Sequence, residues 1–231
     1  MYVPNVLLSG IVGSTAYGLA GPNSDVDRLG VFAEPTAAFH GLHPPLGRDA
    51  THVGHDPDIT MHEAGKLATL CLSSNPTVTE LLWLPAELYE TRTELGDELI
   101  GIRGAFASAK RVRDAYFGYA TSQLKRLVET GQFQSKMRAR SAKHGRHLLR
   151  LLDQGYGYYT TGQLTIRVDD PQRYLDFGEQ VAADPEHART ALAEAEARFD
   201  AARSPLPDQP DEATVEAWLL RVRAHFYEAT R

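Results

Sequence analysis

The chain has 231 residues, of which 42% are hydrophobic and 23% are charged. This size allows one sizeable core, or a core with a smaller helical lobe, and it excludes three domains, a repeat array and a disordered tail. The formal net charge of −6 would by itself argue against a nucleic-acid partner.

The charge is unevenly distributed along the chain. Residues 103–150 contain twelve basic and two acidic residues, a local charge of +10, whereas the rest of the chain has twelve basic against 28 acidic residues. The basic residues of this segment are Arg103, Lys110, Arg111, Arg113, Lys125, Arg126, Lys136, Arg138, Arg140, Lys143, Arg146 and Arg150. Despite the negative net charge of the whole chain, this segment could therefore bind a polyanion such as a nucleic acid.

Cysteine content and the N-terminus indicate the compartment. The single cysteine, Cys71, excludes an internal disulfide and a cysteine-based zinc cage, and it lies in the apolar stripe of an expected helix, as a buried structural thiol does. The first residues lack both a basic n-region and an apolar run long enough for a signal or a span. We expect a cytoplasmic protein with no membrane partner.

The predicted elements begin with strands and end with helices. The strand-like segments are residues 6–12, 24–32, 51–53 and 58–60, with a brief helix at 15–20 and a long loop at 35–57. Helical periodicity follows at 61–72, 77–84, 95–107, 109–130 and 135–154, interrupted at Gly131 and closed at Gly155. Residues 155–168 favour a turn plus an edge strand, 203–209 a proline-rich hinge, and 211–230 a final helix.

Two aspartates at i, i+2 are the first candidate for chemistry. Side chains at alternate positions of a strand share one face, so Asp25 and Asp27 would project together about 6.6 Å apart. Two carboxylates so placed repel, and one or two divalent cations would relieve that repulsion. An isolated Asp-x-Asp is more often a solvated loop pair.

Gly13 and Ser14, just upstream, strengthen the case for a site. A glycine at a strand end lets a phosphate approach the backbone, and the first turn after it offers free N–H groups and a favourable dipole. The Ser14 hydroxyl adds a donor. The simpler alternative is a plain turn with a capping serine.

The segments around Gly13-Ser14 and Asp25-Val26-Asp27 resemble the motifs of a known family. Gly13-Ser14-Thr15-Ala16-Tyr17-Gly18-Leu19-Ala20, then Ser24-Asp25-Val26-Asp27 and Gly30-Val31-Phe32, are similar to the polymerase-beta-type nucleotidyltransferases, and within them to RlaP-like proteins, a group associated with RNA repair. Softer similarities are Asn75-Pro76-Thr77, Glu80-Leu81-Leu82, Lys143 with His147, Arg150-Leu151-Leu152 and Thr161-Gly162-Gln163-Leu164.

The resemblance implies an α+β fold, in which a small mixed β-sheet with packed helices precedes a helical lobe. It implies a catalytic domain at residues 1–90, a helical lobe at 91–202 with basic helices, and a hinge with a C-terminal helix at 203–231. It further implies metal-dependent transfer of a nucleoside monophosphate from an NTP to a hydroxyl acceptor, with release of pyrophosphate.

The resemblance also implies roles for individual acids. Asp25 and Asp27 match the two aspartates that hold the metal, Mg²⁺ or alternatively Mn²⁺. The third acid of the superfamily is assigned to Asp58, with Asp56 and Asp49 as alternatives. The third carboxylate would help bind the metal that activates the attacking hydroxyl, and a second metal would neutralise the departing phosphates.

Lys143, His147 and Arg150 follow an i, i+4, i+7 spacing, which places them on one face of a helix. Such a row can be a solvated surface, or the acidic remainder of the chain can neutralise it. The resemblance favours Lys143 and Arg150 facing the nucleotide phosphates, with His147 nearby. Segment 103–150 would bind the acceptor if that acceptor is RNA or another nucleic acid.

Five of the nine histidines, His40, His43, His52, His55 and His62, fall within 23 residues of a proline-rich loop. Their spacing offers no third strong ligand for zinc, so a polar loop over the mouth of the active site is favoured over a metal site.

The leading functional hypothesis is a nucleotidyltransferase acting on RNA or another hydroxyl acceptor. Two alternatives keep the same site and change the acceptor: an aminoglycoside-like antibiotic, or a protein that is AMPylated within a toxin–antitoxin pair. A third is a nucleotide- or RNA-binding adaptor that has lost its chemistry.

Overall fold

The computed structural model describes residues 3–22, 24–129 and 135–227 and divides the chain into two compact units. We call Met1–Ala107 with Pro210–Arg231 the sheet unit, and Ser108–Gln209 the helical unit. Within the described ranges, the helices are too short or too polar to span a bilayer.

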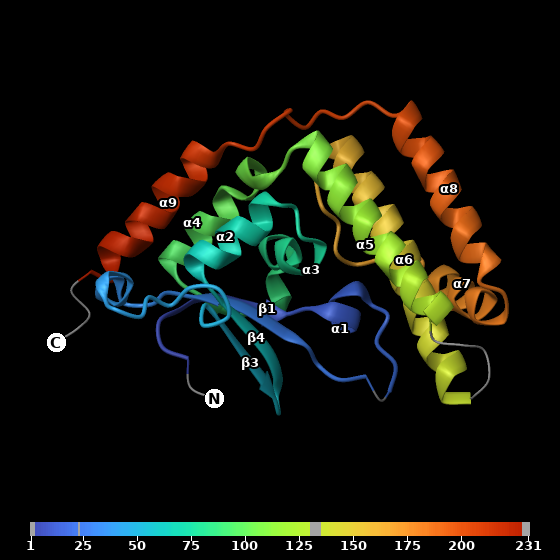
Figure 1. The fold of residues 1–231 in the computed structure, drawn as a ribbon, viewed down its shortest axis with the longest axis horizontal. Helices are drawn as coiled ribbons and strands as arrows, with labels where there is room; N and C mark the ends of the chain where they lie inside the picture. Colours follow the sequence, from blue (N-terminus) through green and yellow to red (C-terminus); the bar gives the residue numbers. More distant parts are fainter. Residues whose placement is uncertain (1–2, 23, 130–134, 228–231) are drawn as a thin grey trace. The chain divides into compact units, whose positions relative to one another are not determined.

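The sheet unit contains a five-stranded mixed sheet (Figure 1). Its strands are β1 (Val6–Ile11), β2 (Arg28–Phe32), β3 (Thr51–His55), β4 (Asp58–Glu63) and β5 (Tyr89–Arg92), in the order β3-β4-β2-β1-β5. β2 and β4 are parallel, and the other neighbours are antiparallel. The sheet with its packed helices confirms the predicted α+β class.

Helices of this unit pack on the sheet through their apolar faces. The helical segments are α1 (Gly13–Tyr17), η1 (Thr36–His40), α2 (Ala64–Leu72), α3 (Pro76–Thr79), η2 (Glu80–Trp83), η3 (Ala86–Leu88), α4 (Glu94–Gly101), η4 (Arg103–Phe106) and α9 (Glu212–His225). α2 packs against β2 and β4, and α4 packs against β1. Leu8, Val31, Leu67 and Leu99 are fully buried between them, so this layer forms the core of the unit.

The last helix, α9, belongs to the sheet unit, although it follows the helical unit in sequence. The indole N–H of Trp218 donates to the carbonyl of Leu95 at 3.0 Å. The Arg223 guanidinium donates to both oxygens of Glu63 at 2.6 and 3.0 Å. The units therefore have different bounds from the domains predicted at 1–90, 91–202 and 203–231, because these contacts return α9 to the sheet.

The helical unit consists of α5 (Ala109–Glu129), α6 (Ser135–Thr161), α7 (Pro171–Ala183) and α8 (Glu186–Ala201). α6 contacts each of the other three. Glycines allow the closest approaches: a Cβ on Gly178 would lie 2.6 Å from the Ala142 carbonyl, and one on Gly155 would lie 2.5 Å from the Tyr116 Cβ.

One prediction at the level of elements is wrong, and one strand was missed. Helix α6 continues through Gly155 to Thr161, so the edge strand expected at residues 155–168 is absent from that described segment. Gly155 packs tightly against Tyr116 and so serves the α5–α6 contact instead of ending the helix. The predicted strands also did not include β5, which pairs with β1. The predicted break at Gly131 lies outside the described residues.

Candidate active site

The Gly13–Ser14 turn lies directly against one of the candidate metal ligands. After β1 ends, the Val12 backbone N–H donates to the Asp27 carbonyl at 3.0 Å. Gly13 adopts a φ of +67°, and a Cβ at this position would lie 2.3 Å from Asp27 Oδ2. The position therefore excludes a side chain twice, by backbone conformation and by the adjacent carboxylate.

Asp25 and Asp27 precede β2 instead of lying within it. The strand begins at Arg28, and just before it the Asp27 carbonyl accepts from the Val12 N–H. Asp25 is exposed and Asp27 is half-buried. The cation next to them, Arg28, is already engaged, because its Nε donates to the carboxylate of Glu90 on β5 at 2.9 and 3.0 Å.

Asp58 is the first residue of β4, at the same end of the sheet as the start of β2. The parallel register pairs Arg28 with Ile59, so one residue earlier Asp27 is level with Asp58 on the neighbouring strand. Neighbouring strands lie about 4.8 Å apart. The two alternatives for the third acid lie elsewhere: Asp56 in the β3–β4 turn, and Asp49 before β3. Strand register thus favours Asp58 among the three.

Two of the candidate carboxylates, Asp25 and Asp27, are better candidates for holding a divalent cation than a set of three that includes Asp58. Asp25 and Asp58 form no ion pair within the described ranges, so they are open hard-oxygen ligands. No three His, Cys, Asp or Glu side chains of the described residues gather closely enough to hold one metal. Mg²⁺ is commonly held by one or two carboxylates, with water and phosphate completing the coordination, so two ligands such as Asp25 and Asp27 would be enough.

The hydroxyl of Ser14 is available to a ligand. Ser14 is half-buried, and its side chain makes no hydrogen bond within the part of the chain that the structure describes. Its backbone carbonyl accepts from the Leu19 N–H at 2.9 Å, which closes the turn behind it. A side-chain donor beside Gly13 suits a phosphate oxygen.

A buried contact behind this turn was not predicted. The Tyr17 hydroxyl donates to Glu80 Oε2 at 2.5 Å, and the two side chains are 6% and 3% exposed. The sequence contained a signal for it: Glu80 is a charged residue directly before the apolar run Leu81-Leu82-Trp83, and a buried acid requires a hydrogen-bonding partner.

The predicted nucleotide ligands of the helical unit have unequal exposure. Lys143 is exposed, His147 is half-buried and Arg150 is 1% exposed. Arg150 Nη1 donates to Gln154 Oε1 at 2.5 Å, and Nη2 donates to His147 Nδ1 at 3.1 Å. Gln154 in turn donates to the carbonyls of Thr165 and Ile166. Arg150 therefore acts within a buried network, and Lys143 faces solvent.

The same network fixes the protonation state of His147. An arginine only donates hydrogen bonds, so the Nδ1 of His147 accepts and its proton resides on Nε2. Burial, followed by the positive charge of Arg150, lowers the pKa of His147 to about 3. Its neighbour His144 donates from Nδ1 to Gln123 Oε1 at 2.8 Å, and burial and nearby cations lower its pKa as well.

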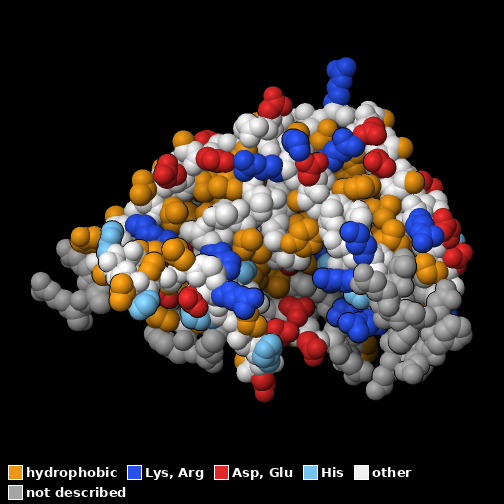
Figure 2. Space-filling model, in the orientation of Figure 1, with side chains coloured by type: hydrophobic (Ala, Val, Ile, Leu, Met, Phe, Trp, Pro, Cys, Tyr) orange, Lys and Arg blue, Asp and Glu red, His pale blue; other side chains and the backbone are white. Residues whose placement is uncertain are grey.

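Acids of the helical unit neutralise part of the basic segment. Arg113 pairs with Asp200 of α8 at 2.5 Å, and Arg138 pairs with Glu179 of α7 at 3.5 Å. Lys110 pairs with Asp114. Within the helical unit's part of the segment, Lys125, Arg140, Lys143 and Arg146 are described cations for which the structure shows no ion pair. Figure 2 shows clustered Lys and Arg side chains beside histidines on the visible face.

The histidine-rich segment is spread over several elements. His62 is buried in β4, where Nδ1 lies 3.0 Å from the Thr51 hydroxyl, and burial lowers its pKa to about 4. The His52 ring contacts Phe32 with centroids 4.9 Å apart. His40, His43 and His55 are exposed. Cys71 is buried on α2, as predicted, and burial raises its pKa to about 12.

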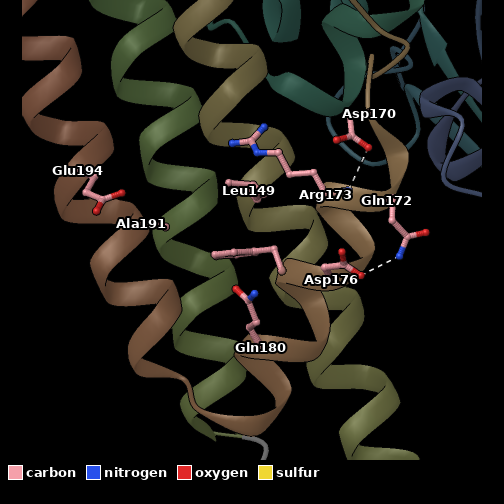
Figure 3. A pocket seen from close by; sticks show the side chains of 9 residues that line it. Leu149, Asp170, Gln172, Arg173, Asp176, Gln180, Ala191 and Glu194 are labelled. Carbon is pink, nitrogen blue, oxygen red and sulfur yellow. Dashed lines mark hydrogen bonds between the residues drawn. The ribbon is translucent and has the colours of Figure 1, made fainter.

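An open pocket of about 530 Å³ lies within the helical unit, among α6, α7 and α8 (Figure 3). It is lined by Leu149, Asp170, Gln172, Arg173, Asp176, Phe177, Gln180, Ala191 and Glu194. Some of its polar groups are already hydrogen-bonded: Gln172 donates to Asp176 at 2.7 Å, and Asp170 accepts from the Arg173 backbone N–H at 3.3 Å. None of the predicted site residues lines it.

A mixed sheet with a Gly-Ser turn held against the second aspartate of an Asp-x-Asp sequence is characteristic of the polymerase-beta-like nucleotidyltransferases. Comparison with known families matches residues 2–163 to RlaP, described as the RNA repair pathway DNA polymerase beta family. This match covers more than two thirds of the chain, and the protein belongs to that family. Membership indicates nucleotidyltransferase activity in general. A search of curated proteins finds no match to the chain.

Proposed function

We propose that the protein transfers a nucleoside monophosphate from an NTP to a hydroxyl group of an RNA and releases pyrophosphate. The observation that carries this proposal is the contact of the Asp27 carboxylate with Gly13, because it combines a phosphate-binding turn and a metal ligand in one site. The association of the family with RNA repair favours RNA as the acceptor.

Residues of the sheet unit would perform the chemistry. Asp25 and Asp27 would hold a divalent cation, Mg²⁺ or Mn²⁺. Asp58 is level with Asp27 on the neighbouring strand but does not gather with the pair into a three-ligand group, and it stays the proposed third acid of the site. When bound, the metal would stabilise the negative charge of the transferring phosphate. Gly13 would let a phosphate reach the backbone, and the Ser14 hydroxyl would donate to a phosphate oxygen.

Residues of the helical unit would bind phosphates. Lys143, an exposed cation with no acid partner in the described ranges, is proposed to bind a phosphate directly. His147 would donate from Nε2 as a neutral imidazole, and Arg150 would hold it in that orientation. Together with the exposed side chains of Lys125 and Arg140, Lys143 would provide cations for an RNA backbone.

The acceptor is tested by label transfer. The protein is incubated with each α-labelled NTP, with Mg²⁺ or Mn²⁺, and with separate pools of RNA, DNA, protein lysate and aminoglycosides. We expect metal-dependent label in the RNA pool. Label in another pool would replace RNA as the acceptor, and NTP binding without transfer to any pool would favour an adaptor.

A further inference from the structure

The phosphate-binding turn is built on a helix that has little stability of its own. α1 has five residues, no side chain caps its start, and Gly18 ends it at a φ of +77°. Isolated helices of this length are unstable in water. The position of Gly13 and Ser14 therefore depends on contacts that α1 makes with the rest of the sheet unit.

One such contact ties the last residue of α1 to a distant segment. The Tyr17 hydroxyl donates to Glu80 Oε2 at 2.5 Å, across 63 residues of sequence. Glu80 begins η2, whose residues Glu80 to Trp83 are all buried. Since η2 is fixed in the core, Glu80 provides an immobile acceptor for Tyr17.

The chemistry of this pair exceeds what packing requires. A phenylalanine could fill the volume of the Tyr17 ring, and an apolar residue would avoid the desolvation of a buried carboxylate. A charge-assisted hydrogen bond is directional and shorter than a neutral one. It restrains the orientation of α1 more tightly than apolar contacts do.

We propose that the Tyr17–Glu80 hydrogen bond positions the Gly13–Ser14 turn for the NTP phosphates. Both members are positioning residues that act through α1 and do not touch the nucleotide. This inference rests on the proposed function, because it assumes that the turn binds phosphate.

The test compares variants that separate positioning from stability. Tyr17→Phe removes the donor and leaves Glu80 buried, whereas the double variant Tyr17→Phe/Glu80→Met removes both polar groups, which restores much of the stability. Glu80→Gln keeps an acceptor for Tyr17. The matched control is Tyr89→Phe, which removes a hydroxyl that donates to the Leu81 carbonyl at 2.9 Å in the same unit.

Equilibrium dialysis gives the Kd for each of the four NTPs with Mg²⁺, and thermal unfolding gives the midpoint. We expect Tyr17→Phe to raise the Kd about tenfold, since small displacements of binding groups are costly. In the double variant the midpoint should recover while the Kd stays raised. Glu80→Gln, which keeps a neutral hydrogen bond to Tyr17, should raise the Kd less than Tyr17→Phe does. Tyr89→Phe should keep a Kd close to that of the wild type.

Two results would overturn the inference. One is a Kd of Tyr17→Phe equal to that of the wild type. The other is a double variant in which both the unfolding midpoint and the Kd return to the wild-type values. A wild-type protein that binds none of the four NTPs would instead overturn the proposed function, and this inference with it.

Discussion

Gly13 is the single residue on which the geometry of the site depends most. Its φ of +67° lies in the left-handed region, which costs a residue with a side chain about 1–2 kcal/mol. The 2.3 Å approach to Asp27 Oδ2 is a separate constraint, because an added Cβ must displace that carboxylate.

Gly13→Ala should therefore reduce nucleotidyl transfer about a hundredfold, the typical loss when a reacting group is displaced by about 1 Å. The matched control is Gly47→Ala, because Gly47 has a φ of +62° and open space around its Cβ position. Both variants carry the same backbone strain. Label transfer measures the rate, and equal losses in the two variants would show that strain alone is responsible.

His147 should make stability depend on pH. Its pKa of about 3 in the native state lies below the ordinary value of 6.5, so below pH 6.5 the unfolded chain binds a proton that the native protein does not. Its contribution to stability is therefore present above pH 6.5 and is lost as the pH falls towards 3.

Between pH 7.5 and 5.5, the wild type should lose about 1.4 kcal/mol more unfolding free energy than His147→Gln does. Urea denaturation at the two pH values measures this difference. The same loss in both proteins would show that His147 is protonated in the native state.

Motifs that are local in sequence were easier to predict than contacts between residues distant in sequence. Gly13, Ser14, Asp25 and Asp27 are close in sequence, and the structure places Gly13 against the Asp27 carboxylate as their spacing suggests. Their use as one site stays a prediction. The burial of Arg150 could not be predicted, because it depends on how α6 packs and on Gln154, which holds the segment after that helix.

At the level of elements, α9 is held by one buried and one exposed ion pair. The side chain of Glu63 is 3% exposed, and Arg223 is its ion-pair partner. Two residues earlier, Arg221 pairs with Glu98 at 2.9 Å, with the two side chains 50% and 35% exposed. The same helix thus provides both a test and its control.

Arg223→Met should lower the free energy of unfolding by about 3 kcal/mol, because it leaves the Glu63 carboxylate buried without its cation. Arg221→Met should cost at most about 1 kcal/mol, since exposed pairs contribute little. Chemical denaturation gives both values. Equal effects would mean that α9 is held by its apolar face, including Trp218, and not by the buried pair.

Secondary structure was most predictable where periodicity was long. The 3.6-residue patterns predicted α5 and most of α6, whereas β5 was missed because Tyr89-Glu90-Thr91-Arg92 is short and polar. Its partner β1 lies about 80 residues earlier in the sequence, and a strand that depends on so distant a pairing leaves little local signal.

At the scale of the whole molecule, the helical unit is an insertion in the sheet unit. The two connecting segments run side by side: the Asp211 N–H donates to the Ala105 carbonyl at 2.8 Å, and the Ala109 N–H donates to the Pro207 carbonyl at 2.9 Å. The sequence predicted a proline-rich hinge here, but the return of α9 to the sheet depends on contacts distant in sequence.

Because these ends are adjacent, joining Ala107 to Pro210 through a short Gly-Ser linker should give a sheet unit that folds alone. Residues 1–107 without α9 should not fold, since Glu63 and the site of Trp218 would lose their partners. Circular dichroism with thermal unfolding measures both. The prediction would be contradicted if the fragment without α9 unfolded cooperatively, or if the linked unit did not.

The central claim is that Asp25 and Asp27 hold the divalent cation of a nucleotidyltransferase beside the Gly13–Ser14 turn. The most direct measurement is metal-dependent transfer of α-labelled nucleotide by Asp25→Asn and Asp27→Asn, with Asp56→Asn in the β3–β4 turn as the control. Each site variant should lose about a thousandfold in rate, the equivalent of several kcal/mol of metal stabilisation, and keep its unfolding midpoint. Asp56→Asn should retain full activity. Wild-type rates in both site variants would contradict the claim.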